Sequence, residues 1–522
     1  MKKLLFFIIG AALFTSCHKD LDRFPTNDVT SEVVYQNTEG YLQAAAKMYG
    51  AFALTGNQGP AGNGDIRGID EGYSDFLRLY WKAQELSTDE AVVAWGDAGI
   101  QDFHNMNWSS DNGFLAGLYY RSMYQITLAN EFIKQAAPDV VSGRGISGND
   151  AANINDFRNE ARFLRAYQYW VLMDLFGNPP FVTEQDVIGS GTLPNQINRA
   201  DLFNYVESEL LELETLLKDA RTNEYGRADK GAVWALLARL YLNAQVYTGT
   251  SKYTEAITYA NKVISAGYSL TGDYHHLMLA DNHLNTNEFI FTINYDGTRT
   301  QSFGGTTFLA KASVGGDMPS AQFGLNEGWG GIRTTKALVN LFPNANGTGD
   351  RRAQFWTAGQ SLEIADQTQF SQGYAVIKIR NVKRDNTPGS NTAFSDVDFP
   401  LFRLAEQYLI YAEAVLRGGT GGNAGTALDY INQLRTRAGA ANIAASQLTL
   451  NYVLDERARE LYWEGFRRTD LIRYDLFTTA TYLWPWKGGV ANGRAVESFR
   501  NLYPIPSADR SANPTLDQND GY

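Results

Sequence analysis

Residues 160–176 read EARFLRAYQYWVLMDLF, and this stretch decides how the rest of the chain is interpreted. Its apolar side chains recur three and four residues apart, which places them on one face of a helix. They are Phe163, Leu164, Tyr167, Trp170, Val171 and Leu175. Gly177 and the pair Pro179-Pro180 follow, and both residue types end helices. We therefore predict an amphipathic helix that ends at Phe176 and packs its apolar face into a core.

The same period recurs along much of the chain, which predicts a mostly α-helical protein. The further segments are 115–136, 200–217, 230–246, 253–265, 401–417, 426–438 and 448–468. Short connections join several of them, so neighbouring helices are expected to run antiparallel. The pairs 230–265 and 401–438 carry small residues where two helices would approach closely, as tetratricopeptide (TPR) units do. We predict TPR-like helix pairs that stack into a right-handed solenoid scaffold.

Two loop-rich stretches interrupt the helical pattern, from about residue 55 to 112 and from about 281 to 400. The second contains the short apolar runs FIFTIN (289–294) and YAVIKI (374–379), which are typical of strands. Irregular segments carried by a rigid scaffold commonly hold binding residues. The functional site is therefore expected in these two insertions.

The composition excludes several classes of function. Of 522 residues, 44% are hydrophobic and 20% are charged, as in a folded protein. Asp and Glu number 57 against 45 Lys and Arg, which gives a net charge of −12. Because an acidic chain gains nothing from a polyanion, we expect no nucleic-acid partner. The single cysteine excludes an internal disulfide framework and a cysteine-based zinc site.

Residues 1–16 have the pattern of a bacterial lipoprotein signal peptide. Two lysines precede an apolar run from 4 to 14, which is too short to cross a bilayer core of about 30 Å. The Thr-Ser-Cys that ends at Cys17 looks like a lipobox, although Phe14 stands where that pattern prefers leucine. We predict cleavage before Cys17, a lipid on its sulfur and a tether over residues 17–35. Multiple acyl chains would anchor such a protein stably to a membrane.

Recognised catalytic and metal-binding motifs are absent from the sequence. The five histidines do not form the H-E-x-x-H arrangement of zinc proteases, and neither a G-x-S-x-G elbow nor a P-loop occurs. The segment after Asp281 offers carboxylate and amide oxygens for a structural calcium ion, but their spacing matches no calcium loop. We therefore predict neither a metal nor a cofactor. The acidic pairs Asp70-Glu71 and Asp89-Glu90 are the candidates for a glycosidase acid and nucleophile.

Aromatic residues are abundant, with 10 Trp, 29 Tyr and 28 Phe. Four of them stand beside Gly or Asn in the irregular segments, where the backbone can present a ring face to solvent. They are Trp95, Trp108, Phe303 and Trp329. An exposed ring receives the apolar C–H face of a sugar while neighbouring polar groups bond its hydroxyls. These residues therefore favour glycan binding over catalysis.

Several stretches carry a specific resemblance to one family. They are the segment around 17–25 and the segments 160–181, 226–244, 399–414, 454–474 and 502–522. Together they resemble the SusD/RagB family of outer-membrane nutrient-uptake lipoproteins of Bacteroidetes, over essentially the whole chain after the signal. The resemblance implies a SusD-like fold in a single body, residues 36–522. Within it, an N-terminal part with TPR-like helices would run to about 270 and a C-terminal part would run from about 271.

The resemblance also implies a function. It predicts a non-catalytic glycan-binding lipoprotein, anchored by its lipid to the cell outer membrane and exposed at the surface. The implied ligand is an oligosaccharide. The implied protein partner is a SusC-like TonB-dependent transporter, over which the protein sits as a lid and to which it delivers the sugar.

A narrower likeness concerns the starch-binding members of that family. It is carried by 85–97 (ELSTDEAVVAWGD), 303–311 (FGGTTFLAK), 326–332 (NEGWGGI) and 482–493 (YLWPWKGGVANG). By position, Trp95, Phe303 and Trp329 would form an aromatic arc that follows the curve of an α-glucan. Asp70 and Arg78 would contact its hydroxyl groups.

The chain departs from the starch-binding pattern at three places. Val93 stands where those proteins tend to carry a second tryptophan, and Asp97-Ala98 lies near an expected amide contact. Phe303 replaces a tyrosine and so lacks a hydroxyl donor. These changes would narrow the arc or shift the preferred glycan.

Two other classes of protein stay open at this point: a glycoside hydrolase on a helical scaffold, and a TPR-like docking protein or adhesin. The charged residues of the strongest motifs favour neither class. We expect them to form ion pairs that hold the scaffold together. They are Glu160, Arg162, Arg165, Arg467, Arg468 and Asp470.

Overall fold

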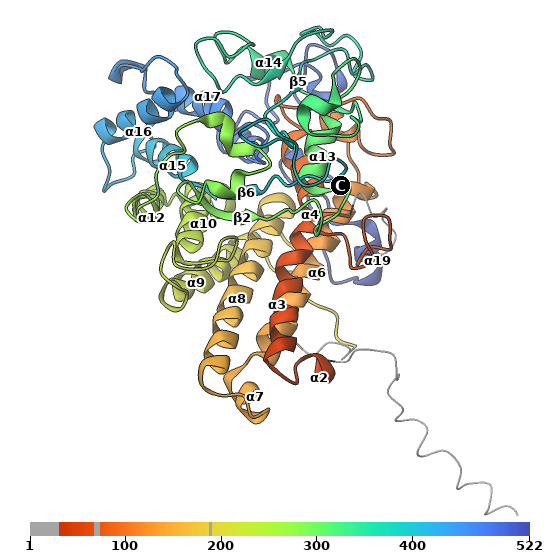
Figure 1. The fold of residues 1–522 in the computed structure, drawn as a ribbon, viewed down its shortest axis with the longest axis vertical. Helices are drawn as coiled ribbons and strands as arrows, with labels where there is room; N and C mark the ends of the chain where they lie inside the picture. The colour runs from red at the N-terminus through yellow and green to blue at the C-terminus, as the bar shows by residue number, and fades with distance from the viewer. Residues whose placement is uncertain (1–30, 67–73, 187–190) are drawn as a thin grey trace, which may run out of the picture.

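The computed structural model describes residues 31–66, 74–186 and 191–522 (Figure 1). Its helices are α2 Ser31–Val34, α3 Thr38–Ala53, α4 Phe76–Glu85, α5 Asp102–Asn105, α6 Gly113–Gln135, α7 Pro138–Gly143, α8 Gly148–Phe176, α9 Arg199–Leu216, α10 Lys230–Leu242, α11 Ala244–Thr248, α12 Tyr253–Ile264, α13 Gly305–Ala312, α14 Lys336–Val339, α15 Leu404–Leu416, α16 Ala424–Arg437, α17 Leu450–Leu461, α18 Arg467–Arg473 and α19 Ser507–Ala512. The strands are β1 Val92–Val93, β2 Phe289–Ile293, β3 Ile332–Arg333, β4 Phe355–Trp356, β5 Ala375–Val376 and β6 Phe399–Arg403. The predicted mostly helical fold is confirmed.

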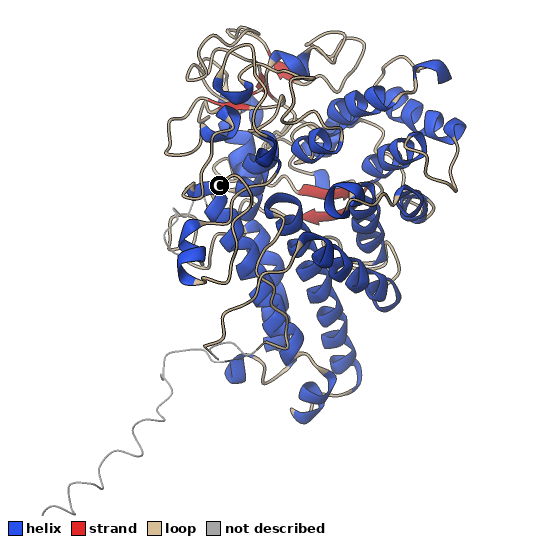
Figure 2. Ribbon diagram, turned by 180° about the vertical axis from the view of Figure 1, so that it is seen from behind, coloured by secondary structure: helices blue, strands red, loops and turns tan. Residues whose placement is uncertain are grey.

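The helices and the loops occupy different parts of the molecule. In Figure 1, α3, α6 and α8 run side by side down the long axis, and α10, α12, α15 and α16 lie on one flank. Figure 2 shows the long loops gathered on the opposite flank, around α13, α14 and β5. One hydrophobic core extends through both parts, from Tyr35 to Leu516. The described residues therefore share a core, while a division near residue 270 stays a prediction.

Helix α8 contains the stretch that opened the sequence analysis. It begins at Gly148, before the predicted segment, and ends at Phe176 as predicted. Gly177 follows it with a φ of 74°, and a Cβ there would lie 2.9 Å from Leu502 Cδ1. Glycine is required because the conformation is left-handed and the neighbouring side chain leaves no room.

The two predicted helix pairs are present on the helical flank. Helix α10 packs against α12, α12 against α15, and α15 against α16. Ala232, Ala235 and Ala238 are fully buried in α10, which allows this close approach. Tyr408 of α15 stacks on Tyr430 of α16, with ring centroids 4.4 Å apart. The TPR-like classification and the handedness of the stack stay predictions.

The predicted helix over residues 448–468 is wrong near its C-terminal end, at residues 462–466. The structure has α17 and α18 there, because the chain turns between them with a φ of 66° at Trp463 and 83° at Gly465. Trp463 donates from its backbone N to Glu90 Oε2 (3.1 Å) and from Nε1 to Glu90 O (3.0 Å). A Cβ at position 465 would lie 2.8 Å from Tyr80 Cε1. These long-range contacts override the helical period of the sequence.

The other boundary corrections are smaller. The segment 401–417 begins as strand β6 and becomes α15 only at Leu404, while 230–246 divides into α10 and α11. FIFTIN forms β2, which pairs antiparallel with β6, so that Phe289 opposes Arg403 and Ile293 opposes Phe399. YAVIKI contributes only the two residues of β5. The remaining pairs of strands are β1 with β3 and β4 with β5.

The expected scaffold ion pairs are confirmed for five of the six residues, and the expectation is wrong for Arg468. Arg162 contacts Glu209 (2.9 Å) and Glu212 (2.8 Å), and Arg165 also contacts Glu209 (3.1 Å). Further pairs are Arg227–Glu160 (2.5 Å), Arg467–Asp89 (2.7 Å) and Arg457–Asp470 (2.7 Å). Arg468 instead donates to the backbone O of Asn501 (2.8 Å).

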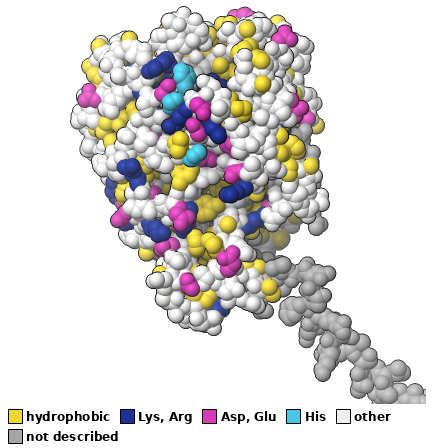
Figure 3. Space-filling model, viewed as in Figure 1, with side chains coloured by type: hydrophobic (Ala, Val, Ile, Leu, Met, Phe, Trp, Pro, Cys, Tyr) yellow, Lys and Arg dark blue, Asp and Glu magenta, His cyan; other side chains and the backbone are white. Residues whose placement is uncertain are grey.

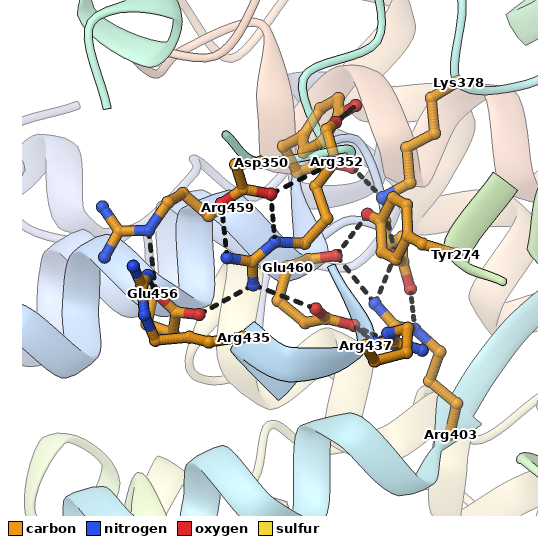
Figure 4. Close-up of polar contacts among 12 residues, drawn as sticks. Tyr274, Asp350, Arg352, Lys378, Arg403, Arg435, Arg437, Glu456, Arg459 and Glu460 are labelled. Atoms are coloured by element: carbon orange, nitrogen blue, oxygen red, sulfur yellow. Dashed lines mark hydrogen bonds and ion pairs between the residues drawn. The ribbon is translucent and has the colours of Figure 1, made fainter. Parts of the chain in front are cut away.

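A larger network of charges is buried where β6 and α17 meet (Figure 4). Arg403 contacts Glu460 (2.7 Å), Glu464 (2.7 Å) and Glu288 (3.0 Å). Lys378 donates to Glu464 Oε1 and to Tyr462 O, each at 2.7 Å. The network joins segments that are far apart in the sequence.

Glu460 is the central carboxylate of this network. It contacts Arg352 (3.2 Å) and Arg437 in addition to Arg403. Burial alone would raise the pKa of Glu460, but the three guanidinium groups hold that pKa well below its usual range. Glu460 is therefore ionised wherever the protein is folded near neutral pH.

We expect Glu460→Gln to lower the free energy of unfolding by about 3–5 kcal/mol, because it leaves buried guanidinium groups without their shared carboxylate. Lys336→Ala is the control, since it removes an exposed pair with Glu363 and is expected to cost less than about 1 kcal/mol. Urea denaturation monitored by circular dichroism measures both changes. Equal effects of the two substitutions would contradict a structural role for the network.

Candidate functional site

A row of partly exposed aromatic rings lies on the loop-rich flank. The ring centroids of Trp95 and Trp329 are 6.5 Å apart, and those of Trp329 and Phe303 are 6.4 Å apart. Successive rings are inclined by 52° and 58°. All three side chains are half-buried, with part of each open to solvent. The structure thus brings together the three aromatic residues that the sequence singled out for a glycan arc, while their binding role stays a prediction.

Strands β1 and β3 place the two tryptophans. Val93 opposes Ile332 in the ladder, and Ala94 N donates to Gly331 O (2.8 Å) just beyond it. Trp95 then donates from Nε1 to Trp329 O (3.2 Å). Val93 stands where the starch-binding members tend to carry a second tryptophan, and its side chain is buried.

Arg78 of α4 supports the row from beneath. It is 5% exposed and donates from Nη1 to Phe303 O (3.0 Å). Its guanidinium lies 5.9 Å from the centroid of Trp95 and 4.6 Å from that of Phe308. This geometry suits a positioning residue, and a direct contact with sugar hydroxyls stays a prediction. Asp70, the other predicted polar contact, lies outside the described residues, as does Cys17.

Lys311 of α13 contacts Trp329 through both its ammonium group and its backbone. Its ammonium is 5.4 Å from the indole centroid and donates to Asn326 Oδ1 (2.7 Å) and Glu327 Oε1 (3.3 Å). Trp329 N also donates to Lys311 O (2.8 Å). Asn326 and Glu327 are exposed beside the ring, so amide and carboxylate groups border the aromatic surface.

Sequence reasoning missed a fourth ring. Phe394 lies with its centroid 5.6 Å from that of Phe303 and is also half-buried. Its neighbours in the sequence, Thr392 and Ser395, mark the same kind of polar loop that drew attention to the other rings. A search for Phe in such loops, and not only for aromatic residues beside Gly or Asn, would have found it.

The expectation that Trp108 presents a ring face to solvent is wrong. Trp108 is 1% exposed, and its ring centroid is 4.8 Å from that of Tyr503. Its Nε1 donates to Tyr522 Oη (2.6 Å), so its polar atom is also satisfied inside the protein. Trp108 belongs to the core.

The acidic pair Asp89-Glu90 is buried as well, which removes it as a glycosidase candidate. Arg467 donates to both carboxylate oxygens of Asp89 at 2.7 Å. Burial raises the pKa of Glu90 to about 7, with Arg467 opposing and Asp89 adding to this effect. A protonated acid beside a carboxylate is the chemistry of a glycosidase, but sugar cannot reach these two groups. The pair Asp70-Glu71 lies outside the described residues.

Two hollows in the described part of the chain are lined by residues outside the aromatic row. A hollow of about 730 Å³ lies between α6 and residues 181–186 and 192–201, and one of about 330 Å³ lies between α3 and β2. Figure 3 shows basic and acidic side chains interspersed on one face, with a group of histidines among them. His275 and His276 lie 3.3 and 3.9 Å from Asp273.

The described ranges contain no group of three or more His, Cys, Asp or Glu side chains that could hold a metal ion. Within the same ranges, every helix is too short or too polar to span a lipid bilayer.

Solved structures share the fold of this chain. A SusD superfamily protein from Parabacteroides distasonis aligns with a TM-score of 0.70 and 24% identity, covering 95% of this chain and 100% of that one. Surface glycan-binding protein A from Bacteroides thetaiotaomicron, solved in complex with laminarihexaose, aligns with a TM-score of 0.68 and 20% identity, covering 92% and 99%. These likenesses concern the architecture.

The chain belongs to the SusD family. It is 36% identical to the starch-binding protein SusD of Bacteroides thetaiotaomicron over 97% of this chain and 96% of that protein. It is 27% identical to the SusD-like protein P25 of Formosa agariphila, over 97% and 95%. Residues 352–522 match the model of the SusD family, and residues 80–242 match one described as starch-binding, associating with outer membrane. The relative with 36% identity is named for binding, in agreement with the expectation of a non-catalytic protein.

Gly331→Ala is expected to displace Trp95, because a Cβ at this position would lie 2.3 Å from Trp95 Cε2. Gly96→Ala is the matched control, since a Cβ there meets nothing within 4 Å although it adjoins the same tryptophan. Acrylamide quenching of tryptophan fluorescence should change for Gly331→Ala and not for Gly96→Ala. An unchanged quenching constant in both would contradict the packing of Trp95 on this glycine.

Proposed function

We propose that this protein is a non-catalytic, surface-exposed lipoprotein that captures an α-glucan oligosaccharide and delivers it to a SusC-like TonB-dependent transporter. The observation that carries the proposal is the row of half-buried rings formed by Trp95, Trp329 and Phe303, with centroids 6.4 and 6.5 Å apart. Such a row offers consecutive apolar faces to one saccharide chain.

The physical argument is the removal of water from two apolar surfaces at once. Each ring that stacks on a sugar contributes about 0.5–1.5 kcal/mol, so several must act together. The inclinations of 52° and 58° between successive rings suit a ligand that turns along its length, as an α-linked glucan does, more than a flat ribbon. Asn326 and Glu327 border the row and supply partners for hydroxyl groups.

The comparisons support this choice of ligand in part. The relative with 36% identity is named for starch binding, whereas a structural neighbour with 20% identity was solved with laminarihexaose. The shared fold alone therefore does not fix the glycan. The choice of an α-glucan rests on the relative and on the inclined rings together.

The sequence supports the parts of the proposal that concern the membrane anchor and the transporter. Cys17 follows a short apolar run, which favours a lipid anchor. The matched description of residues 80–242 includes association with the outer membrane. A protein tethered there gains from a transporter beside it, since its captured sugar has to cross that membrane.

Trp329→Ala is expected to weaken binding of maltoheptaose about 2- to 12-fold, because one stacking contact, that of the central ring, is lost. Trp234→Ala is the matched control: Trp234 is also half-buried, but it lies on α10 and donates to Glu214. Isothermal titration calorimetry measures both variants. Binding that is unchanged by Trp329→Ala would contradict the site, and release of sugars at enzymatic turnover would contradict the receptor function.

Cys17→Ala is expected to abolish lipid attachment, because the acylated sulfur is removed. Ser16→Ala keeps a small residue before the cysteine and should leave attachment unchanged. Labelling with a radioactive fatty acid and fractionation of membranes in a Bacteroidetes host measure both. A labelled Cys17→Ala protein would contradict anchoring at this residue.

A further inference from the structure

Phe394 adds a fourth ring to the aromatic row, and the function proposed above assigns no role to it. The ring contacts run in series, from Trp95 to Trp329 (6.5 Å), to Phe303 (6.4 Å) and to Phe394 (5.6 Å). Phe394 is inclined by 41° to Phe303, a step similar to the other two. The fourth ring thus adds another inclined aromatic face next to Phe303.

The loop that carries Phe394 is fixed on both sides of it. Asn326 N, close to Trp329, donates to Thr392 O (3.0 Å). Ser395 N donates to Thr307 Oγ1 of α13 (2.9 Å), and Ser395 is itself buried. Phe394 is therefore held to the same two segments that carry Trp329 and Phe303. Hydrogen bonds to the backbone of Thr392 and Ser395 thus position Phe394 relative to Trp329 and Phe303.

Phe394 keeps part of its ring open to solvent although other residues of the loop are buried. Ser395 and Val397 are buried, so the loop points other side chains inward while the Phe394 ring stays half-buried. Together with Phe303, Trp329 and Trp95, the Phe394 ring forms a contiguous, partly exposed apolar surface, and such surfaces mark ligand-binding sites. A ring held rigidly in partial contact with water is suited to receive a ligand surface.

The two ends of the row differ in chemistry. Trp95 and Trp329 present indoles, which offer the larger faces and therefore retain short ligands. Phe303 and Phe394 have no hydroxyl or N–H donor, so they contribute stacking alone. A ligand gains from the phenylalanine end only when it is long enough to extend beyond the tryptophans.

We infer that Phe394 forms an additional stacking subsite that makes the protein prefer longer α-linked gluco-oligosaccharides over short ones. The inference rests on the proposed function of the same row. It adds a length preference and names the residue responsible for it.

The test is calorimetric titration of the full-length protein with maltotriose and with maltoheptaose. Phe394→Ala is expected to raise the Kd for maltoheptaose about 2- to 12-fold, which corresponds to the loss of one stacking contact, and to leave the Kd for maltotriose unchanged. Phe394→Leu keeps apolar volume without a ring face and should behave in the same way. Phe394→Tyr keeps the ring and should bind both ligands as the unmodified protein does.

Phe157→Ala is the matched control, because Phe157 is half-buried on α8 and covered by Arg227. The inference is overturned if Phe394→Leu or Phe394→Ala binds maltoheptaose as tightly as the unmodified protein, or loses the same factor for both ligands. If the unmodified protein binds neither maltooligosaccharide, the proposed α-glucan specificity fails instead. The two failures are therefore distinguishable.

Discussion

The burial of paired charges around Glu460 is the constraint on which the rest of the structure depends. Arg403 brings strand β6 to α17 through Glu460 and Glu464, and Lys378 attaches the loop after β5 to the same carboxylate of Glu464. Such groups are costly to remove from water, so each must keep all of its partners. That requirement fixes the positions of β6, α17 and the loop after β5 relative to one another, which non-directional hydrophobic packing does not do by itself.

The charge network is connected to the aromatic row by Trp463, the residue before Glu464. Trp463 binds the carboxylate and the backbone of Glu90, and Glu90 stands just before β1. Strand β1 pairs with β3, and this ladder ends with the bond from Ala94 N to Gly331 O, next to Trp95. A rigid interior thus positions rings that are themselves partly in water. Because little rearrangement is then needed on binding, less free energy is lost in ordering the site.

The sequence predicted the parts of the molecule that follow local rules. The helical period located the scaffold helices, and aromatic residues beside glycine located Trp95, Phe303 and Trp329. It failed where distant residues decide the backbone, as at Trp463, whose turn depends on Glu90 and Tyr80. It also failed at Trp108, whose burial depends on Tyr503 and Tyr522. No local pattern distinguishes a tryptophan that a remote segment covers from one that stays open.

The pairing of β2 with β6 has a consequence for how members of this family can exchange segments. Residues 352–522, which match a family model by themselves, contain Arg403 and Arg352 but not their partners Glu288 and Asp350. A recombination boundary at residue 352 would leave Arg403 and Arg352 with Glu456, Glu460 and Glu464, but would separate them from Glu288 and Asp350. The buried charge network therefore extends across the edge of the matched region, and a segment cut at residue 352 would lack two of its carboxylates.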